Sequence, residues 1–280
     1  MRPLRVEAPA KLNLSLAVTA RRPDGFHELD SELVLLELAD RLLLLPGCSG
    51  LRVEGEGSDA LPLGADNLAW RGLLAGIGHA PDAVCLTLDK RIPVAAGLGG
   101  GSSDAAAAWR LGRQTEGGSD RPEAATLATL SGIGADVPFF AAQLAAARVT
   151  GIGERVAPLA AAPDAHHVVL AHPPFGLSTA AVFRELRPDE WSGRAERGRN
   201  DLLGPALRLR PGIEDVMRRI VAAGGAPQLS GSGPTVFALT ADPERAAGIA
   251  ARLEADGLRA THTRLRSEAA SIEGIGELEE

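Results

Sequence analysis

The feature that most constrains this chain is the glycine-rich segment KRIPVAAGLGGGSSD at residues 90–104. An apolar run at 83–88 precedes it and predicts a strand, whereas residues 105–112 predict a helix that is capped by the Ser-Ser-Asp of 102–104 and stopped by Gly112. A helix N-terminus offers free N–H groups and the positive end of the helix dipole, so this order of elements predicts an anion site, typically for phosphate. For the glycine run alone, a flexible connector is the alternative.

Two common phosphate-binding loops do not fit this segment. A P-loop needs Lys and Ser/Thr directly after its last glycine, but Gly101 is followed by Ser102, and no lysine occurs further along the chain. The dinucleotide pattern G-x-G-x-x-G, counted from Gly97, ends on Ser102 instead of glycine. Both patterns are therefore excluded.

Composition excludes several other classes of protein. With 280 residues the chain is long enough for two domains, and a content of 45% hydrophobic and 23% charged residues argues against disorder. A net charge of −7 disfavours general binding to nucleic acid or anionic membranes. We expect no signal peptide and no membrane-spanning segment. Cys48 and Cys85 are too few for a disulfide framework and lack metal-ligand spacing, so a cytoplasmic location fits.

Lysine is almost absent from this chain. Of 29 basic residues, only Lys11 and Lys90 are lysine. An ammonium group is compact and mobile, whereas a guanidinium is a wide planar fork, so the two are not interchangeable at a tight phosphate site. We interpret Lys11 as functional; Lys90 is either functional or the end of a strand. A strong compositional bias toward arginine is the alternative for both.

Residues 10–16, with the sequence AKLNLSL, alternate in polarity and predict a strand. Its leucines face one side, which we expect to be the core. Lys11, Asn13 and Ser15 share the other side, which is either a solvated surface or one wall of a site.

Three turns carry residues that suit a site. The Pro-Asp-Gly turn at 21–28 displays Phe26 and His27, which could form a pocket wall. Asp136 lies two residues before a proline, so it is either a helix N-cap or a carboxylate that accepts a proton in a cleft. The small residues of 229–237 form either a tight hairpin or a loop that supports the phosphate site.

Together these segments resemble the GHMP small-molecule kinases. The matching stretches are APAKLNLSL, RRPDGFHEL, KRIPVAAGLGGGSSDAA, GADVPFF, HPPFGLSTAAVF and LSGSGPTVF. They occur in the family's order and span residues 8–237, which is most of the chain.

The resemblance implies an α+β fold of two domains. The N-terminal domain, residues 1–160, would be like the second domain of ribosomal protein S5, and the C-terminal domain, residues 161–280, would be ferredoxin-like and open with a strand at 167–170. We expect a mobile loop at 185–200, which is charged and patternless, and a solvated acidic tail at 267–280.

The resemblance also implies an activity. The Phe-His turn and the extended GLGGGSS favour members that use ATP to phosphorylate the 2-hydroxyl of 4-diphosphocytidyl-2-C-methyl-D-erythritol, in non-mevalonate isoprenoid synthesis. Another GHMP small-molecule kinase, of homoserine or mevalonate type, is the first alternative. A catalytically silent nucleotide-binding member is the second.

Roles follow from the matched positions. Asp136 would be the catalytic base and Lys11 its partner, which stabilises charge on the moving phosphoryl group. ATP would lie against Lys90, Pro93, Val94, Ala95, Ala96, Gly97, Leu98, Gly99, Gly100, Gly101, Ser102 and Ser103. Ser102 and Ser103 would lie near Mg²⁺. The cytidyl substrate would be held by Asn13, Phe26, His27, Thr179 and Phe183, with the cytosine stacked between aromatic rings.

This chain departs from the family pattern at four positions. Phe26 stands where relatives usually carry Tyr, which keeps stacking and removes a hydroxyl. Ala95 and Ala96 replace glycines that are usual in the nucleotide loop, and Asp104 replaces a common Asn.

Overall fold

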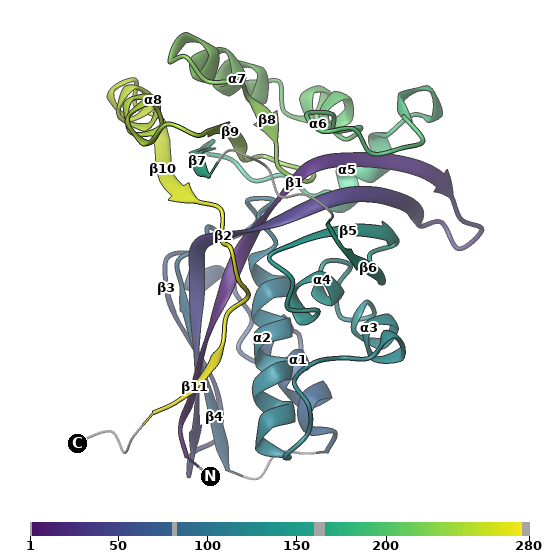
Figure 1. Ribbon diagram of the computed structural model, residues 1–280, viewed down its shortest axis with the longest axis vertical. Coiled ribbons are helices and arrows are strands. Elements are labelled where there is room, and N and C mark those ends of the chain that lie inside the picture. Colours follow the sequence, from purple (N-terminus) through teal and green to yellow (C-terminus); the bar gives the residue numbers. More distant parts are fainter. Residues whose placement is uncertain (1, 80–82, 160–165, 276–280) are drawn as a thin grey trace.

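The computed structural model describes residues 2–79, 83–159 and 166–275, and it folds around two sheets (Figure 1). In its first sheet the order is β11-β1-β2-β4-β3, with β5 paired to β2 and β6 to β5. The strands are β1 (Leu4–Arg21), β2 (His27–Pro46), β3 (Gly50–Gly55), β4 (Val84–Lys90), β5 (Ala146–Gly151), β6 (Arg155–Pro158) and β11 (Ile272–Gly274). The pair β3–β4 is parallel, and the others are antiparallel.

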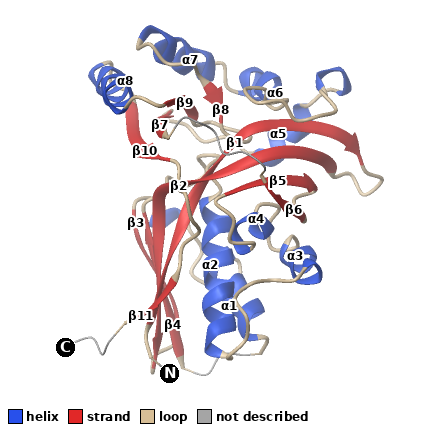
Figure 2. Ribbon diagram, in the orientation of Figure 1, coloured by secondary structure: helices blue, strands red, loops and turns tan. Residues whose placement is uncertain are grey.

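Helices cover one face of this sheet (Figure 2). They are α1 (Leu68–Ile77), α2 (Gly100–Thr115), α3 (Ala124–Leu130) and α4 (Val137–Ala141), with a short 3₁₀ turn at Ser58–Ala60. Leu73 of α1 and Leu111 of α2 pack into one core with Leu42 and Leu86 of the strands. This packing fixes α2, and therefore the loop before it, on the sheet.

The predicted strand at 83–88 and the predicted helix at 105–112 are both present, but the predicted ends of the helix are wrong. Helix α2 begins at Gly100, because Gly99 turns the chain with a left-handed φ of 72°, and it continues past Gly112 to Thr115. A Cβ on Gly112 would lie 2.8 Å from the carbonyl oxygen of Leu73 on α1. Gly112 is therefore a site of close helix packing and not a helix stop.

The second sheet is antiparallel with the order β10-β7-β9-β8. Its elements are β7 (His167–His172), α5 (Thr179–Glu185), a 3₁₀ turn (Pro188–Glu190), α6 (Leu203–Leu209), α7 (Gly212–Ala222), β8 (Gln228–Leu229), β9 (Val236–Thr240), α8 (Pro243–Ala255) and β10 (Arg259–Arg264). The strand order agrees with the expected ferredoxin-like arrangement, and β7 contains the strand predicted at 167–170. No helix within the described ranges is long and apolar enough to span a membrane.

Two connections tie the parts of the chain together. Strands β1 and β2 run on from the first sheet toward the second (Figure 1), and Leu16 and Val18 of β1 enter a core with Val169 of β7. At the other end β11 returns to pair with β1. The solvated tail expected from residue 267 is therefore wrong for 272–274. The predicted boundary at residues 160 and 161 lies outside the described residues and stays a prediction.

The segment at 185–200 is bonded along the edge of β1. The backbone N–H of Gly193 donates to Val18 O (3.2 Å), and that of Gly198 donates to Leu14 O (2.9 Å). In return the N–H of Leu16 donates to Arg199 O (3.0 Å). The segment has no periodic hydrophobic pattern because its backbone is irregular and lies against the edge of β1.

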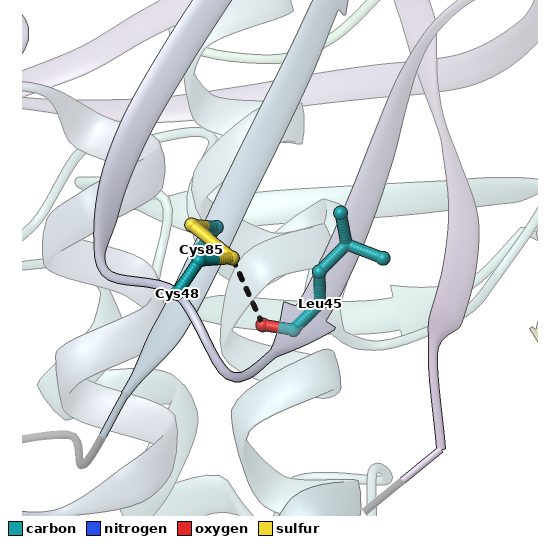
Figure 3. The surroundings of a disulfide bond; sticks show 3 residues. All are labelled: Leu45, Cys48 and Cys85. Atoms are coloured by element: carbon teal, nitrogen blue, oxygen red, sulfur yellow. Dashed lines mark hydrogen bonds between the residues drawn. A yellow bond between two sulfur atoms is a disulfide. The ribbon is translucent and has the colours of Figure 1, made fainter. Parts of the chain in front are cut away.

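Cys48 and Cys85 are joined by a disulfide (Figure 3). Cys48 lies in the turn after β2, and Cys85 lies on β4, where it is the register partner of Leu45. The bond therefore links two segments that the sheet already holds side by side. The two cysteines are too few for a framework of several bridges, but the pairing itself was not predicted from the sequence, and it removes the cysteines as an argument for a reducing cytoplasm.

Candidate active site

A cavity of about 530 Å³ lies where the first sheet and the glycine loop meet helix α5 and the turn between β8 and β9. Among the described residues, its lining includes most of the predicted site: Lys11, Asn13, Lys90, Pro93, Val94, Ala95, Ala96, Gly97, Leu98, Gly99, Gly100, Gly101, Ser102, Asp136, Thr179 and Phe183. Ser103, Phe26 and His27 do not line it. The structure thus brings together residues that are up to 172 positions apart in the sequence, as Lys11 and Phe183 are.

The glycine loop approaches its neighbours too closely for side chains. Gly97 has a φ of 78°, and a Cβ there would lie 2.6 Å from the carbonyl oxygens of both Ser230 and Gly233. Leu98 O accepts a hydrogen bond from the backbone N–H of Lys11 (2.9 Å), which fixes the loop to β1. Ala95 also has a left-handed φ, of 56°, a conformation that costs alanine energy and glycine almost none.

Helix α2 begins at this loop, so its N-terminus faces the cavity. Gly99 is its N-cap, and the next three residues line the cavity. The first N–H groups of a helix have no intrahelical acceptor, and the dipole of a helix of 16 residues adds positive potential there. The strand, loop and helix N-terminus are therefore arranged as the glycine run predicted for an anion site, and anion binding there stays a prediction.

Lys11 and Asp136 face each other across the cavity. Lys11 Nζ lies 3.5 Å from Asp136 Oδ2 and donates a hydrogen bond to Asn13 Oδ1 (2.6 Å). The Lys11 side chain is only 5% exposed, whereas that of Asp136 is 36% exposed. Because an ammonium has three donors, one stays available to a ligand.

The capping alternative for Asp136 can be compared with its contacts. Asp136 does occupy the N-cap position of α4, and Pro138 lies in the first turn, as its position before a proline predicts. Its side chain makes no capping hydrogen bond, however. The carboxylate points toward Lys11 and the cavity, and is available for chemistry.

Lys90 has a different environment. Its ammonium is hydrogen-bonded to Asp40 and to Asp104 Oδ2 (2.8 Å), and all three side chains are at most 3% exposed. Asp40 Oδ1 also accepts the backbone N–H groups of Arg91 (2.6 Å) and Ile92 (2.8 Å). Lys90 touches the cavity, but its charge is neutralised by carboxylates that hold the start of the loop and the start of α2.

Burial and charge in this cluster act most strongly on Asp104. Burial raises the pKa of the Asp104 carboxyl well above its usual range, against the opposing effect of Lys90. Its Oδ1 is buried without a hydrogen-bond partner. The Asp that replaces the family's common Asn thus lies inside the protein, next to Lys90.

A group of aromatic side chains lies next to Phe183, which lines the cavity. The His27 ring stacks on Phe183 with centroids 5.4 Å apart, and Trp191 meets His27 edge-on at 5.8 Å. Burial, followed by the charge of Arg21, lowers the pKa of His27, which keeps the imidazole neutral at neutral pH. Phe26 is 61% exposed and is not among these rings.

Comparison with known proteins gives this geometry a family. Residues 67–143 match the GHMP kinases N terminal domain, and residues 184–258 match the GHMP kinases C terminal model. A 4-diphosphocytidyl-2-C-methyl-D-erythritol kinase of Paracoccus denitrificans is 41% identical over 267 residues, which cover 89% of this chain and 91% of that protein. A kinase of the same name from Streptomyces coelicolor is 41% identical over 281 residues, which cover 90% and 92%.

The chain belongs to the GHMP kinase family. A solved 4-(cytidine 5′-diphospho)-2C-methyl-D-erythritol kinase superposes on it with a TM-score of 0.75 and 37% identity, covering 93% of this chain and 98% of the other. A homoserine kinase from Cytophaga hutchinsonii has a TM-score of 0.67 at 17% identity, covering 98% of both chains, and shows the fold alone. The two-domain α+β fold is thus confirmed, and this GHMP kinase uses ATP to phosphorylate a small molecule.

The donor set of this GHMP kinase can be compared with what Mg²⁺ requires. Mg²⁺ usually keeps several waters and binds one or two protein groups together with substrate phosphates. Ser102 and Asp136 line the same cavity, and no larger cluster of His, Cys, Asp or Glu suitable for a metal occurs in the described part of the chain. The residues present fit such a loosely held ion. Ser103, the other predicted ligand, is 1% exposed, and its hydroxyl has no partner inside the protein.

Sequence reasoning missed one part of this GHMP kinase site. Residues before and at the start of α1 line the cavity: Leu61, Pro62, Asp66, Asn67 and Leu68. Asn67 caps α1 by accepting the N–H of Ala69 (2.9 Å), so an asparagine before an apolar run could have predicted the helix but not the cavity. Gly231 and Ser232 also line the cavity, and they lie in the turn for which the sequence predicts either a tight hairpin or a support for the phosphate site. The turn joins the paired strands β8 and β9, as a hairpin does, and it packs against Gly97 of the glycine loop, as the proposed support requires.

Proposed function

We propose that this GHMP kinase transfers the γ-phosphoryl group of ATP to the 2-hydroxyl of 4-diphosphocytidyl-2-C-methyl-D-erythritol, a step of non-mevalonate isoprenoid precursor synthesis, in the cytoplasm. The observation that carries the proposal is the 41% identity to kinases of that name over about nine tenths of both chains. The cavity supports it, because its lining includes both the N-terminus of α2, which suits an anion, and the ring of Phe183, on which His27 stacks.

In this proposal the triphosphate of ATP lies against residues 93–102. The backbone N–H groups at the start of α2 and the dipole of that helix bind its anionic oxygens. Lys11 lies at the other side of the γ-phosphoryl group and stabilises the charge that spreads over it in the transition state. Mg²⁺, when bound with ATP beside Ser102, neutralises further phosphate charge.

Asp136 acts on the acceptor. Its carboxylate takes the proton of the 2-hydroxyl while the hydroxyl oxygen forms a bond to the γ-phosphorus. The bond between that phosphorus and the bridging oxygen of ADP breaks, and ADP leaves with the electron pair. The 3.5 Å separation from Lys11 Nζ keeps the Asp136 carboxylate beside a positive charge.

The aromatic side chains would hold the cytidyl group. Phe183 and Thr179 line the cavity, and His27 stacks on Phe183, so cytosine would bind against this pair, with the neutral His27 reading its polar edge. Phe26, which is exposed in the turn, would have to close over the base. Lys90 would act on ATP indirectly, by holding the loop through Asp40 and Asp104.

The experiment is a phosphoryl-transfer screen with purified enzyme, ATP and three acceptors: the cytidyl-erythritol compound, homoserine and mevalonate. ADP release with the first compound alone is the expected result. Transfer to homoserine or mevalonate instead would change the proposed substrate but would leave the assignment as a kinase in place, since both compounds are substrates of kinases with the same fold. ATP binding without transfer to any acceptor would indicate the silent nucleotide-binding member.

A further inference from the structure

Asn200 lies outside the cavity lining, and its amide is fully engaged. Its Nδ2 donates to the carbonyl oxygens of Leu229 (3.0 Å) and Gly231 (2.8 Å). Its Oδ1 accepts the backbone N–H of Leu202 (2.9 Å). One donor of the Asn200 side chain therefore goes to the turn of residues 230–233, at Gly231, and the other goes to Leu229, the last residue of β8 directly before that turn.

This turn contacts the acceptor side of the site. A Cβ on Gly231 would lie 3.0 Å from Lys11 Nζ and 3.3 Å from Asn13 Oδ1, so the Gly231 backbone bounds the space in which the catalytic ammonium sits. Ser232 Oγ forms a hydrogen bond of 2.8 Å with Thr179 Oγ1. A shift of the turn would therefore move Lys11 and Thr179 relative to each other.

The same turn contacts the nucleotide side. Ser230 Oγ donates to Gly97 O (3.0 Å), and the backbone N–H of Thr235, just beyond the turn, donates to Ala96 O (3.3 Å). Gly97 in turn has no space for a side chain against Ser230 and Gly233. The turn is thus a spacer between the glycine loop and Lys11, with contacts to both.

We propose that Asn200 is a positioning residue that sets the place of turn 230–233, and through it the place of Lys11 relative to the nucleotide loop. The role rests on the function proposed above only in naming Lys11 as catalytic. Asn is suited to it because one side chain must donate two hydrogen bonds to two carbonyls and accept a third. Aspartate has the same shape, but both of its side-chain oxygens are acceptors, so it cannot donate hydrogen bonds to those carbonyls.

Asp201, the residue after Asn200, has a partner, Ser192, at which a matched control can be made. Asp201 Oδ2 accepts the N–H of Val18 (2.8 Å) and both the N–H and the hydroxyl of Ser192 (2.8 Å each), which ties the segment before Asn200 to β1. The change Ser192→Ala removes one of these bonds and leaves the Asn200 bonds to Leu229 and Gly231 in place. It therefore loosens the same segment without acting directly on residues 230–233.

The experiment compares Asn200→Asp, Asn200→Ala and Ser192→Ala in the full-length enzyme. For each we would measure ADP affinity by calorimetry, kcat and KM for both substrates, and the thermal midpoint. We expect both Asn200 variants to lose about tenfold to hundredfold in kcat and to bind ADP several-fold more weakly, because unpaired buried carbonyls let the turn shift. Ser192→Ala should keep its ADP affinity.

Two results would overturn the proposal. The first is that Asn200→Asp has a kcat and an ADP affinity within twofold of those of the unchanged enzyme. The second is that Ser192→Ala loses as much kcat and ADP affinity as the Asn200 variants do. If the Asn200 variants do not fold, Ser230→Ala removes the bond from the turn to Gly97 O instead, and unchanged ADP affinity there would reject the turn as a spacer. ADP binding does not depend on the acceptor, so a wrong substrate assignment would leave this test intact.

Discussion

Lys11 and Lys90 differ in the charges around them, although both ammonium groups are buried. Lys90 lies between two buried carboxylates, Asp40 and Asp104, so little of its charge reaches the cavity. Lys11 has one carboxylate at 3.5 Å and a neutral amide at 2.6 Å, so it retains positive charge toward a phosphoryl group. At the scale of single residues, the catalytic assignment therefore rests on Lys11 and Asp136.

The change Asp136→Asn tests this assignment directly. Asparagine keeps the size of the side chain but cannot accept the proton of the acceptor hydroxyl. General-base assistance is typically worth about 10²–10⁴-fold, so kcat should fall by that range while ATP affinity stays nearly constant. Steady-state kinetics and calorimetry would measure the two quantities. A kcat within a few-fold of the unchanged enzyme would leave Asp136 with the N-cap role alone.

At the scale of elements, Gly99 links helix α2 to Lys11. A Cβ at this position would lie 2.9 Å from Lys11 Cγ and 3.0 Å from the Phe140 ring, and the φ of 72° is left-handed. Gly117, after the same helix, has a φ of 68° and open space around it. The two glycines share the backbone conformation but not the crowding.

We expect Gly117→Ala to lose about 1–2 kcal/mol of stability for alanine in the left-handed region, and Gly99→Ala to lose at least as much, because its methyl group also crowds Lys11 and Phe140. Only Gly99→Ala should also lose kcat and ATP affinity, since its methyl group displaces Lys11. Thermal unfolding and steady-state kinetics would separate the two effects. Equal kinetics in the two variants would show that the loop tolerates a side chain beside Lys11.

Local patterns were enough to predict several elements, because their causes lie within a few residues. The alternation at 10–16 predicted a strand that lies within β1, and the glycine run predicted the loop before α2. The role of Gly112 was mistaken, because its neighbour Leu73 comes from another helix. Asn200 gave no signal either, since its two carbonyl partners lie 29 and 31 residues away. Contacts of this kind exist only after the chain has folded.

At the scale of the whole molecule, His172 lies at the junction of the two parts. It lines a second cavity of about 450 Å³ behind residues 93–96, together with Arg259, which pairs with Glu56 of the first part. Burial, and then the charge of Arg259, lowers the pKa of His172 to about 4. The folded protein therefore keeps this ring neutral, whereas the unfolded chain protonates it near pH 6.5.

This difference predicts acid sensitivity between pH 6.5 and 4. In that window the unfolded state binds more protons, so stability falls as the pH falls. Between pH 7.5 and 5 the contribution of His172 amounts to about 2 kcal/mol. Urea unfolding at pH 7.5 and pH 5 measures the free energy of unfolding at each pH. The free energy lost between the two pH values should be smaller in His172→Gln than in the unchanged protein, by about 2 kcal/mol. His166→Asn, at an exposed histidine, is the control and should behave like the unchanged protein. If His172→Gln loses as much stability between pH 7.5 and pH 5 as the unchanged protein, the prediction is contradicted.

Strand β1 has consequences for the order in which the protein can be completed. Its neighbour β2 follows it directly, and Leu98 of the glycine loop pairs with Lys11 on the opposite edge, but the rest of that edge is covered by β11 at Leu4–Val6 and by residues 193–201 near Leu14–Val18. These last two covers belong to the last third of the chain, so during synthesis on a ribosome both stretches of the edge stay unpaired while most of the protein emerges. Unpaired edges readily add strands from other chains. A nascent chain that stalls before residue 193 would therefore present its longest open edge to its neighbours.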